Sequence, residues 1–182
     1  STVAALGAKK ATQTIPIVGM GLTEPVAVGV LASIARPGGN VTGVTYSVDA
    51  EIFGKQLQLL KELVPGATTV AVLVNTGNTT ALPLTVDSLQ TAARSLGIQL
   101  KIVEARNPDQ FDEAFARMSK ERAEALVVTG DSMYFLNRAR LADLAVKNRL
   151  PAMSTQAQWV GAGGLISYGP HLPGMWRAGA KY

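Results

Sequence analysis

The chain has 182 residues, 47% hydrophobic and 16% charged, a composition that excludes an intrinsically disordered chain. It has no cysteine and a single histidine, His171, which excludes disulfides, thiolate metal sites and histidine metal clusters. No apolar run reaches the ~18 residues of a membrane span. Residues 1–14 lack the basic-then-apolar order of a signal peptide, so any export signal is expected upstream of Ser1.

The net charge of +4 raises the question of a nucleic-acid partner. Basic residues cluster at Lys9–Lys10 and again at Arg138, Arg140, Lys147 and Arg149. The second cluster falls on a predicted helix without the interleaved aromatic side chains that stack on bases. We therefore interpret it as a solvated helix face and expect no nucleic-acid partner.

The first third of the chain is predicted to alternate between helices and strands. Residues 1–13 have the pattern of the end of a helix, and the apolar run 15–20 predicts a strand. A helix is predicted from Thr23 or Glu24, with Pro25 in its first turn, to Arg36. Pro37-Gly38-Gly39-Asn40 ends this helix before a strand at 41–46.

The alternation continues to the end of the chain. Apolar residues spaced three or four apart predict helices, and short runs rich in β-branched residues predict strands. Gly97 is expected to end one helix and Asn107 to cap the next. The predicted helices are 49–63, 81–96, 108–121, 133–148 and 174–182, and the predicted strands are 69–75, 98–104, 125–130, 150–154 and 164–168.

Several of these strands are nearly continuous apolar runs, such as Val70-Ala71-Val72-Leu73-Val74. Strands of this type are buried on both faces, as in a parallel sheet covered by helices. The predicted fold class is therefore α/β, a doubly wound parallel sheet in an α/β/α arrangement. The strand at 15–20 lacks the partners that its apolarity requires, and we expect the chain to be part of a longer protein.

Longer motifs point to a family. They are TIPIV at 14–18, ARPGGNVTG at 35–43, GKQL at 54–57, LLKELVPG at 59–66, ARSLG at 93–97, RLPA at 149–152 and AGGLISYGP at 162–170. Together they resemble the ABC-importer substrate-binding family, which includes tryptophan- and tyrosine-type binding proteins. The resemblance covers nearly the whole chain, and the motifs at 35–43 and 162–170 are its most specific parts.

The resemblance implies a type I periplasmic binding fold, in which two α/β lobes hold a small molecule in the cleft between them. Residues 1–47 and 164–182 would form a partial lobe one, 48–63 a connecting helix, and 64–163 a nearly complete lobe two. Family members are longer at both ends, so this chain alone is expected to bind small molecules weakly or not at all. The implied partners are ABC permease subunits, the implied location is periplasmic or extracytoplasmic, and no cofactor is implied.

Catalytic motifs are absent from the sequence. It has no Gly-x-Ser-x-Gly elbow and no Walker loop. Gly19-Met20-Gly21 lacks the third glycine of a dinucleotide-binding turn. The alternative function is a small α/β enzyme or a response-regulator-like switch domain. A switch requires an acidic cluster at the strand ends, and Asp131 has no carboxylate neighbour in the other predicted strand-end loops.

Binding is favoured because polar residues follow the predicted strands at their carboxyl ends, where open α/β sheets bind ligands. The candidate ligand-binding residues are Thr23, Glu24, Asn75, Thr76, Asp131, Ser132, Thr155, Gln156 and Tyr168, with Asn78, Ser154 and Ser167 beside them. Each can instead cap a helix or stabilise a turn. Asp131 is the strongest candidate for a polar ligand contact.

Two further expectations concern aromatic residues and hinges. Trp159 and Tyr168 are candidates for stacking on an aromatic ligand, and Trp159 is equally suited to packing between the lobes. Hinges are expected at 47–49 and at Gly163–Gly164, where glycine tolerates large changes of φ and ψ. The sequence does not identify the ligand, and only the family resemblance suggests an aromatic amino acid.

Overall fold

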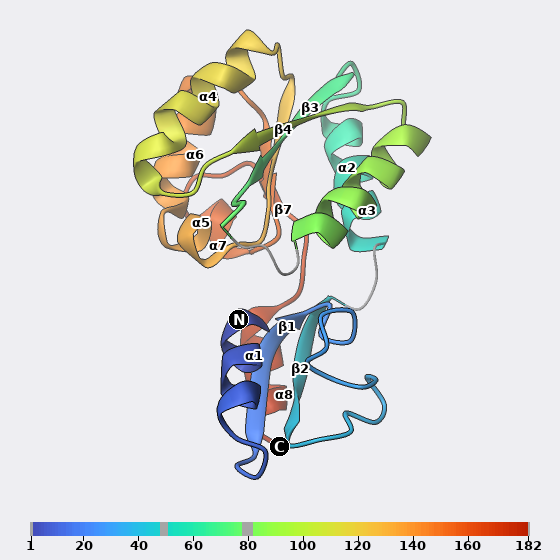
Figure 1. The fold of residues 1–182 in the computed structure, drawn as a ribbon. Coiled ribbons are helices and arrows are strands. Elements are labelled where there is room, and N and C mark those ends of the chain that lie inside the picture. Colours follow the sequence, from blue (N-terminus) through green and yellow to red (C-terminus); the bar gives the residue numbers. More distant parts are fainter. Residues whose placement is uncertain (1, 48–50, 78–81, 182) are drawn as a thin grey trace. The chain divides into compact units, whose positions relative to one another are not determined.

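The computed structural model describes residues 2–47, 51–77 and 82–181, which belong to two compact units (Figure 1). Unit 1 comprises residues 1–49 and 170–182, and unit 2 comprises residues 50–169. None of the helices in the described part of the chain has the length and apolarity needed to cross a bilayer.

Unit 1 is built on two parallel strands, β1 (Ile17–Thr23) and β2 (Val41–Ser47). Helix α1 (Thr2–Ala11) packs on β1, and α8 (Leu172–Gly179) packs on both strands. A Cβ atom at Gly179 would lie 2.2 Å from Met20 Sδ, so glycine permits the close approach of α8 to the sheet. The core of this unit is small and consists of Ala5, Leu22, Val30, Leu31 and Val41.

The helix predicted from Glu24 to Arg36 was wrong, because these residues form turns instead. Glu24 has a φ of +46° and Gly29 a φ of +76°, whereas helical residues need φ near −63°. The backbone amides of Val30 and Leu31 both bond to the carbonyl of Pro25, at 2.8 and 3.0 Å. Gly19, Met20 and Gly21 lie within β1, so they form no dinucleotide-binding turn.

Unit 2 is a five-stranded parallel sheet in the order β4-β3-β5-β6-β7. Its strands are β3 (Thr69–Val74), β4 (Gln99–Glu104), β5 (Ala125–Val128), β6 (Ala152–Ser154) and β7 (Ile166–Ser167). Its helices are α2 (Glu51–Leu63), α3 (Leu82–Ser95), the 3-10 turn η1 (Pro108–Gln110), α4 (Phe111–Lys120), α5 (Ser132–Leu136), α6 (Arg138–Lys147) and α7 (Gln158–Gly161).

Helices cover both faces of this sheet (Figure 1). Ala71 and Leu73 of β3 pack in one core with α4, α5, α6 and α7. Val70, Val72 and Val74 of the same strand pack in a second core with α2 and α3. A strand buried on both faces explains the continuous apolar sequence at 70–74. The predicted doubly wound α/β/α sheet is thereby confirmed.

The helix ends in unit 2 follow local chemistry. Gly97 follows α3 with a φ of +65° and ends the helical segment, as predicted. Asn107 caps η1, as predicted, because its side chain accepts a hydrogen bond from Asp109 N at 3.0 Å. The single helix predicted over 133–148 is divided into α5 and α6 at Asn137. Its Nδ2 donates to the Met133 carbonyl at 2.9 Å, a bond that competes with the helical ladder.

The unit boundaries differ from the predicted ones at two places. Residues 51–63 belong to unit 2, because Leu57 and Leu60 of α2 are buried in its second core. Residues 164–169 also belong to unit 2, because β7 pairs with β6. Gln56 ties the two segments together, since its buried Nε2 donates to the Tyr168 carbonyl at 2.7 Å.

Candidate functional site

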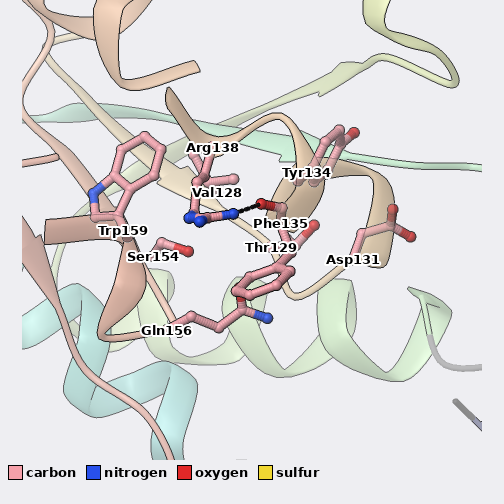
Figure 2. Close-up of a pocket in the computed structure, with 9 residues that line it drawn as sticks. All are labelled: Val128, Thr129, Asp131, Tyr134, Phe135, Arg138, Ser154, Gln156 and Trp159. Carbon is pink, nitrogen blue, oxygen red and sulfur yellow. Dashed lines mark hydrogen bonds between the residues drawn. The ribbon is translucent and has the colours of Figure 1, made fainter. Parts of the chain in front are cut away.

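A pocket opens at the carboxyl ends of β5 and β6 in unit 2 (Figure 2). Val128 and Ser154 are the last residues of these strands and pair across the sheet, so the strands end at one edge. The pocket has about 220 Å³ of empty volume, open solvent included. It is lined by Val128, Thr129, Asp131, Tyr134, Phe135, Arg138, Ser154, Gln156 and Trp159.

Asp131 lies where β5 ends and α5 begins. Its Oδ1 accepts a hydrogen bond from Met133 N at 2.8 Å, which makes it the N-cap of α5. Its Oδ2 accepts a hydrogen bond from Asn75 Nδ2 at 3.3 Å. The structure thus brings together two predicted site residues from the ends of β3 and β5, and it shows the capping role that the sequence left open.

Thr76 and Glu104 form a second polar group on the same edge, at the ends of β3 and β4. The Thr76 hydroxyl donates to the Glu104 carboxylate, and Arg106 Nε bonds to it as well. These two hydrogen bonds, that from Thr76 being the stronger influence, lower the pKa of Glu104. The sequence analysis considered only the loops after the strands and so did not count Glu104, which is the last residue of β4 in the same sheet. Arg106 forms an ion pair with Glu104 and offsets the charge of this carboxylate.

Three polar side chains of the pocket are satisfied by backbone carbonyls. Tyr134 Oη donates to Ala105 O at 2.8 Å, and Thr129 Oγ1 donates to Leu73 O at 2.7 Å. Trp159 Nε1 donates to Ala152 O at 3.2 Å. Burial raises the pKa of Tyr134 well above its ordinary value, so this hydroxyl stays protonated. These hydrogen bonds hold the three side chains in place in the pocket lining.

Trp159 is 2% exposed and belongs to the first core of unit 2, and its indole also lines the pocket. A Cβ atom at Gly164 would lie 2.1 Å from Trp159 Nε1, so the indole packs directly on the glycine backbone. This packing gives Gly164 a structural role in addition to the predicted hinge. The hinge residues 48 and 49 lie outside the described residues.

The remaining predicted residues are more scattered. Gln156 lines the pocket, Ser132 is exposed, and Thr155 is buried at 4% exposure beside the lining residues. Tyr168 is 40% exposed, and its backbone amide donates to Ser154 O at 3.0 Å. Asn78 lies outside the described residues.

Thr23 and Glu24 belong to unit 1. The Thr2 hydroxyl accepts from Thr23 N at 2.9 Å and donates to Thr23 O at 3.2 Å, so the first turn of α1 holds the end of β1. Glu24 adopts a left-handed backbone conformation at the start of the turns that follow.

Arg138 is the charged pocket residue that the sequence analysis missed, because it was assigned to a solvated helix face. It is the first residue of α6, and its Nη1 donates to Phe135 O at 2.9 Å. Its guanidinium carbon lies 4.8 Å from the centroid of the Phe135 ring. The signal that could have found it was Asn137, because asparagine side chains bond to nearby backbone groups, and α5 ends and α6 begins at this residue.

Within the described residues, no group of three or more His, Asp and Glu side chains is placed to hold a metal ion. The lining combines a carboxylate, a guanidinium, a hydroxyl and a carboxamide with aromatic rings. Such a surface suits a small molecule with an apolar part and charged or polar groups.

Known proteins resemble this chain in sequence and in fold. A family model described as ABC transporter substrate binding protein matches residues 1–179. A tyrosine-binding protein from Clostridioides difficile (strain R20291) is 28% identical over 169 residues, which cover 93% of this chain and 48% of that protein. The chain thus spans about half the length of this relative.

Two solved structures are similar in fold. The ABC domain in complex with L-Trp from Streptococcus pneumonia has a TM-score of 0.87 at 22% identity, with coverage of 99% of this chain and 61% of that one. A ligand-free, open substrate binding protein with adhesive properties from Clostridium difficile has a TM-score of 0.64 at 26% identity, with coverage of 90% and 54%. These neighbours confirm the predicted type I periplasmic binding fold.

Proposed function

Because this chain belongs to the ABC transporter substrate binding protein family, we propose that it acts as the solute-binding component of an ABC importer. In this role it captures a small molecule reversibly and without catalysis. The family match over residues 1–179 carries the proposal. The protein acts outside the cytoplasmic membrane, and its partners are the permease subunits that receive the loaded form.

The proposed ligand class is the aromatic amino acids. A tyrosine-binding protein is 28% identical, and a solved protein of the same fold contains L-Trp. The unit 2 pocket supports this class because the aromatic ring of Phe135 and the Asp131 carboxylate both line it. In the proposal, Asp131 binds a polar group of the ligand while it caps α5.

The other predicted ligand-binding residues remain candidates in the proposal. Gln156 lies in the pocket, and Asn75 supports Asp131. The remaining ligand-binding candidates rest on the strand-end argument alone, and they are Thr76, Ser132, Thr155 and Tyr168 in unit 2 and Thr23 and Glu24 in unit 1.

A titration followed by nuclear magnetic resonance tests the proposal, because it detects even millimolar binding. We expect L-Tyr or L-Trp to cause saturable shifts in the backbone amide signals of Thr129, Asp131 and Gln156. L-Lys is the negative control among the ligands. Asp131→Asn should weaken binding, whereas Asp109→Asn, at an exposed carboxylate outside the pocket, should not. Absence of saturable shifts with every aromatic amino acid would contradict the proposed ligand class.

A further inference from the structure

The polar side chains of the unit 2 pocket fall into two groups. Those of Thr129, Tyr134 and Trp159 donate to backbone carbonyls, and Asp131 accepts from Met133 N and Asn75. The second group comprises Arg138, Ser154 and Gln156, whose side chains have hydrogen-bonding capacity that the described residues do not use.

Ser154 is the most informative member of the second group. The residue is 6% exposed and lines the pocket at the end of β6. Its hydroxyl has no hydrogen-bond partner among the described residues, and its backbone carbonyl accepts from Tyr168 N. A hydroxyl at the pocket wall that no described residue uses can donate a hydrogen bond to a ligand that enters the pocket.

Arg138 is distinguished by its burial and by its lack of a counter-charge. Each of the other arginines is exposed, whereas Arg138 is half-buried. Arg106, Arg117 and Arg140 form ion pairs, but Arg138 forms none within the described residues. One hydrogen bond within the described residues, from Nη1 to Phe135 O, uses one of the five N–H donors of its guanidinium.

The Phe135 contacts fix where the remaining donors lie. The carbonyl of Phe135 holds one end of the guanidinium, and its ring lies 4.8 Å from the guanidinium carbon. A guanidinium held this way needs little ordering when it binds an anion, and its planar fork matches a carboxylate. Figure 2 shows the guanidinium in the middle of the pocket view, with Ser154 and Gln156 below it.

We propose that Arg138, with Ser154 and Gln156, binds a carboxylate of the captured molecule and makes this carboxylate a requirement for capture. The identity of the molecule rests on the proposed function, but the requirement for a carboxylate rests on these three side chains. All three donate hydrogen bonds that a carboxylate accepts, and Asp131 on the opposite side of the lining disfavours a purely anionic ligand. An amino acid zwitterion satisfies both conditions.

The test compares matched carboxylates and amides by nuclear magnetic resonance titration. L-Tyrosine is paired with L-tyrosinamide, and sodium benzoate with benzamide, which does not depend on amino-acid recognition. We expect the carboxylate of each pair to bind at least about tenfold more tightly than the amide. We also expect it to shift the Arg138 Nε–H signal.

Variants assign the effect to Arg138. Arg138→Met should lower carboxylate affinity about tenfold or more and leave amide affinity unchanged. Arg140→Met is the matched control, since Arg140 is exposed, lies outside the pocket and pairs with Asp112. Arg138→Lys keeps the charge without the fork and should bind with intermediate affinity. It replaces the methionine variant if that protein does not fold.

The outcomes separate this inference from the proposed function. If L-tyrosine binds wild type and Arg138→Met equally, the inference is overturned and the proposed function stands. If benzoate binds through Arg138 but no aromatic amino acid binds, the inference stands and the proposed ligand class fails. If no carboxylate is preferred over its amide, the inference is overturned whichever ligand binds.

Discussion

At the scale of single residues, Ser154 and Asp131 show how a folded chain divides its polar groups between its own structure and a ligand. The Asp131 carboxylate is used twice by the fold, through Met133 N and Asn75 Nδ2. Ser154 is 6% exposed, and its hydroxyl is used by no described residue. Substitution at Asp131 should therefore lower stability, whereas substitution at Ser154 should not.

We expect Ser154→Ala to weaken binding of a carboxylate ligand several-fold without lowering the melting temperature of the free protein. Removing a hydroxyl that no described residue uses breaks no internal hydrogen bond, but it removes a donor to the ligand. Thermal melts and titrations of the variant provide the measurement. A clear loss of stability would show that the hydroxyl has a structural partner and would remove Ser154 from the site.

Asp131→Ala should lower the free energy of unfolding by about 1 kcal/mol, because α5 loses its N-cap. It should also weaken ligand binding by about 1–3 kcal/mol. Asp131→Ser separates the two roles, since serine caps helices well but carries no charge. If the serine variant binds as tightly as wild type, Asp131 is a cap and nothing more.

At the scale of elements, the sequence predicted what local chemistry determines. Gly97 and Asn107 ended and began helices as expected, and the apolar run at 70–74 became a strand buried on both faces. The helix prediction for 24–36 was wrong because Glu24 and Gly29 adopt left-handed backbone conformations. Conformations of this kind are set by the surrounding fold and not by the local sequence. Arg138 was missed because helical periodicity does not report the break at Asn137.

The amino ends of β3 and β5 are joined by one carboxylate. Glu124 Oε2 accepts hydrogen bonds from Thr68 N at 2.7 Å, Thr69 N at 2.9 Å and Thr68 Oγ1 at 3.0 Å. These bonds, that from Thr68 N first, lower the pKa of Glu124 below its usual 4.5. A carboxyl whose pKa is depressed by folding stabilises the folded state above its unfolded pKa. That stabilisation is lost as the pH falls through the folded pKa.

Glu124→Gln should therefore lower the melting temperature at pH 7, and the difference from wild type should shrink as the pH falls below 4.5. Glu113→Gln is the control, since Glu113 is exposed and has no hydrogen bond through its side chain within the described residues. Melting curves between pH 3 and pH 7 provide the measurement. A difference that is constant over this range would contradict the role of the charge.

At the scale of the whole molecule, the two units differ in how much core they contain. The described part of unit 1 has one core cluster of five buried residues, whereas unit 2 has a cluster on each face of its sheet. A small core buries less apolar surface and supports less local stability.

We expect the amides of β1 and β2 to exchange with solvent at least about tenfold faster than those of β3 and β5, a difference of about 1.4 kcal/mol in opening free energy. Hydrogen exchange followed by nuclear magnetic resonance resolves the individual strands. Equal protection in both units would indicate that the protein opens only as a whole.

Closure of two lobes on a ligand, which the family resemblance implies, stays a prediction about the whole molecule. Closure predicts that the radius of gyration falls when ligand binds, while the interior of the unit 2 sheet is unchanged. Small-angle scattering with and without saturating L-Tyr or L-Trp measures it. A radius that does not change at saturation would argue against a closing cleft.

The division of the chain also has a consequence during protein synthesis. Unit 2 is continuous in sequence, whereas unit 1 is assembled from residues 1–49 and 170–182. At typical elongation rates, the residues of unit 2 take on the order of ten seconds to translate. During that time β1 and β2 lack α8, which is the helix that packs on both strands. Unit 2 can therefore complete its core before unit 1 can, and β1 and β2 stay without the packing of α8 until the last residues of the chain are made.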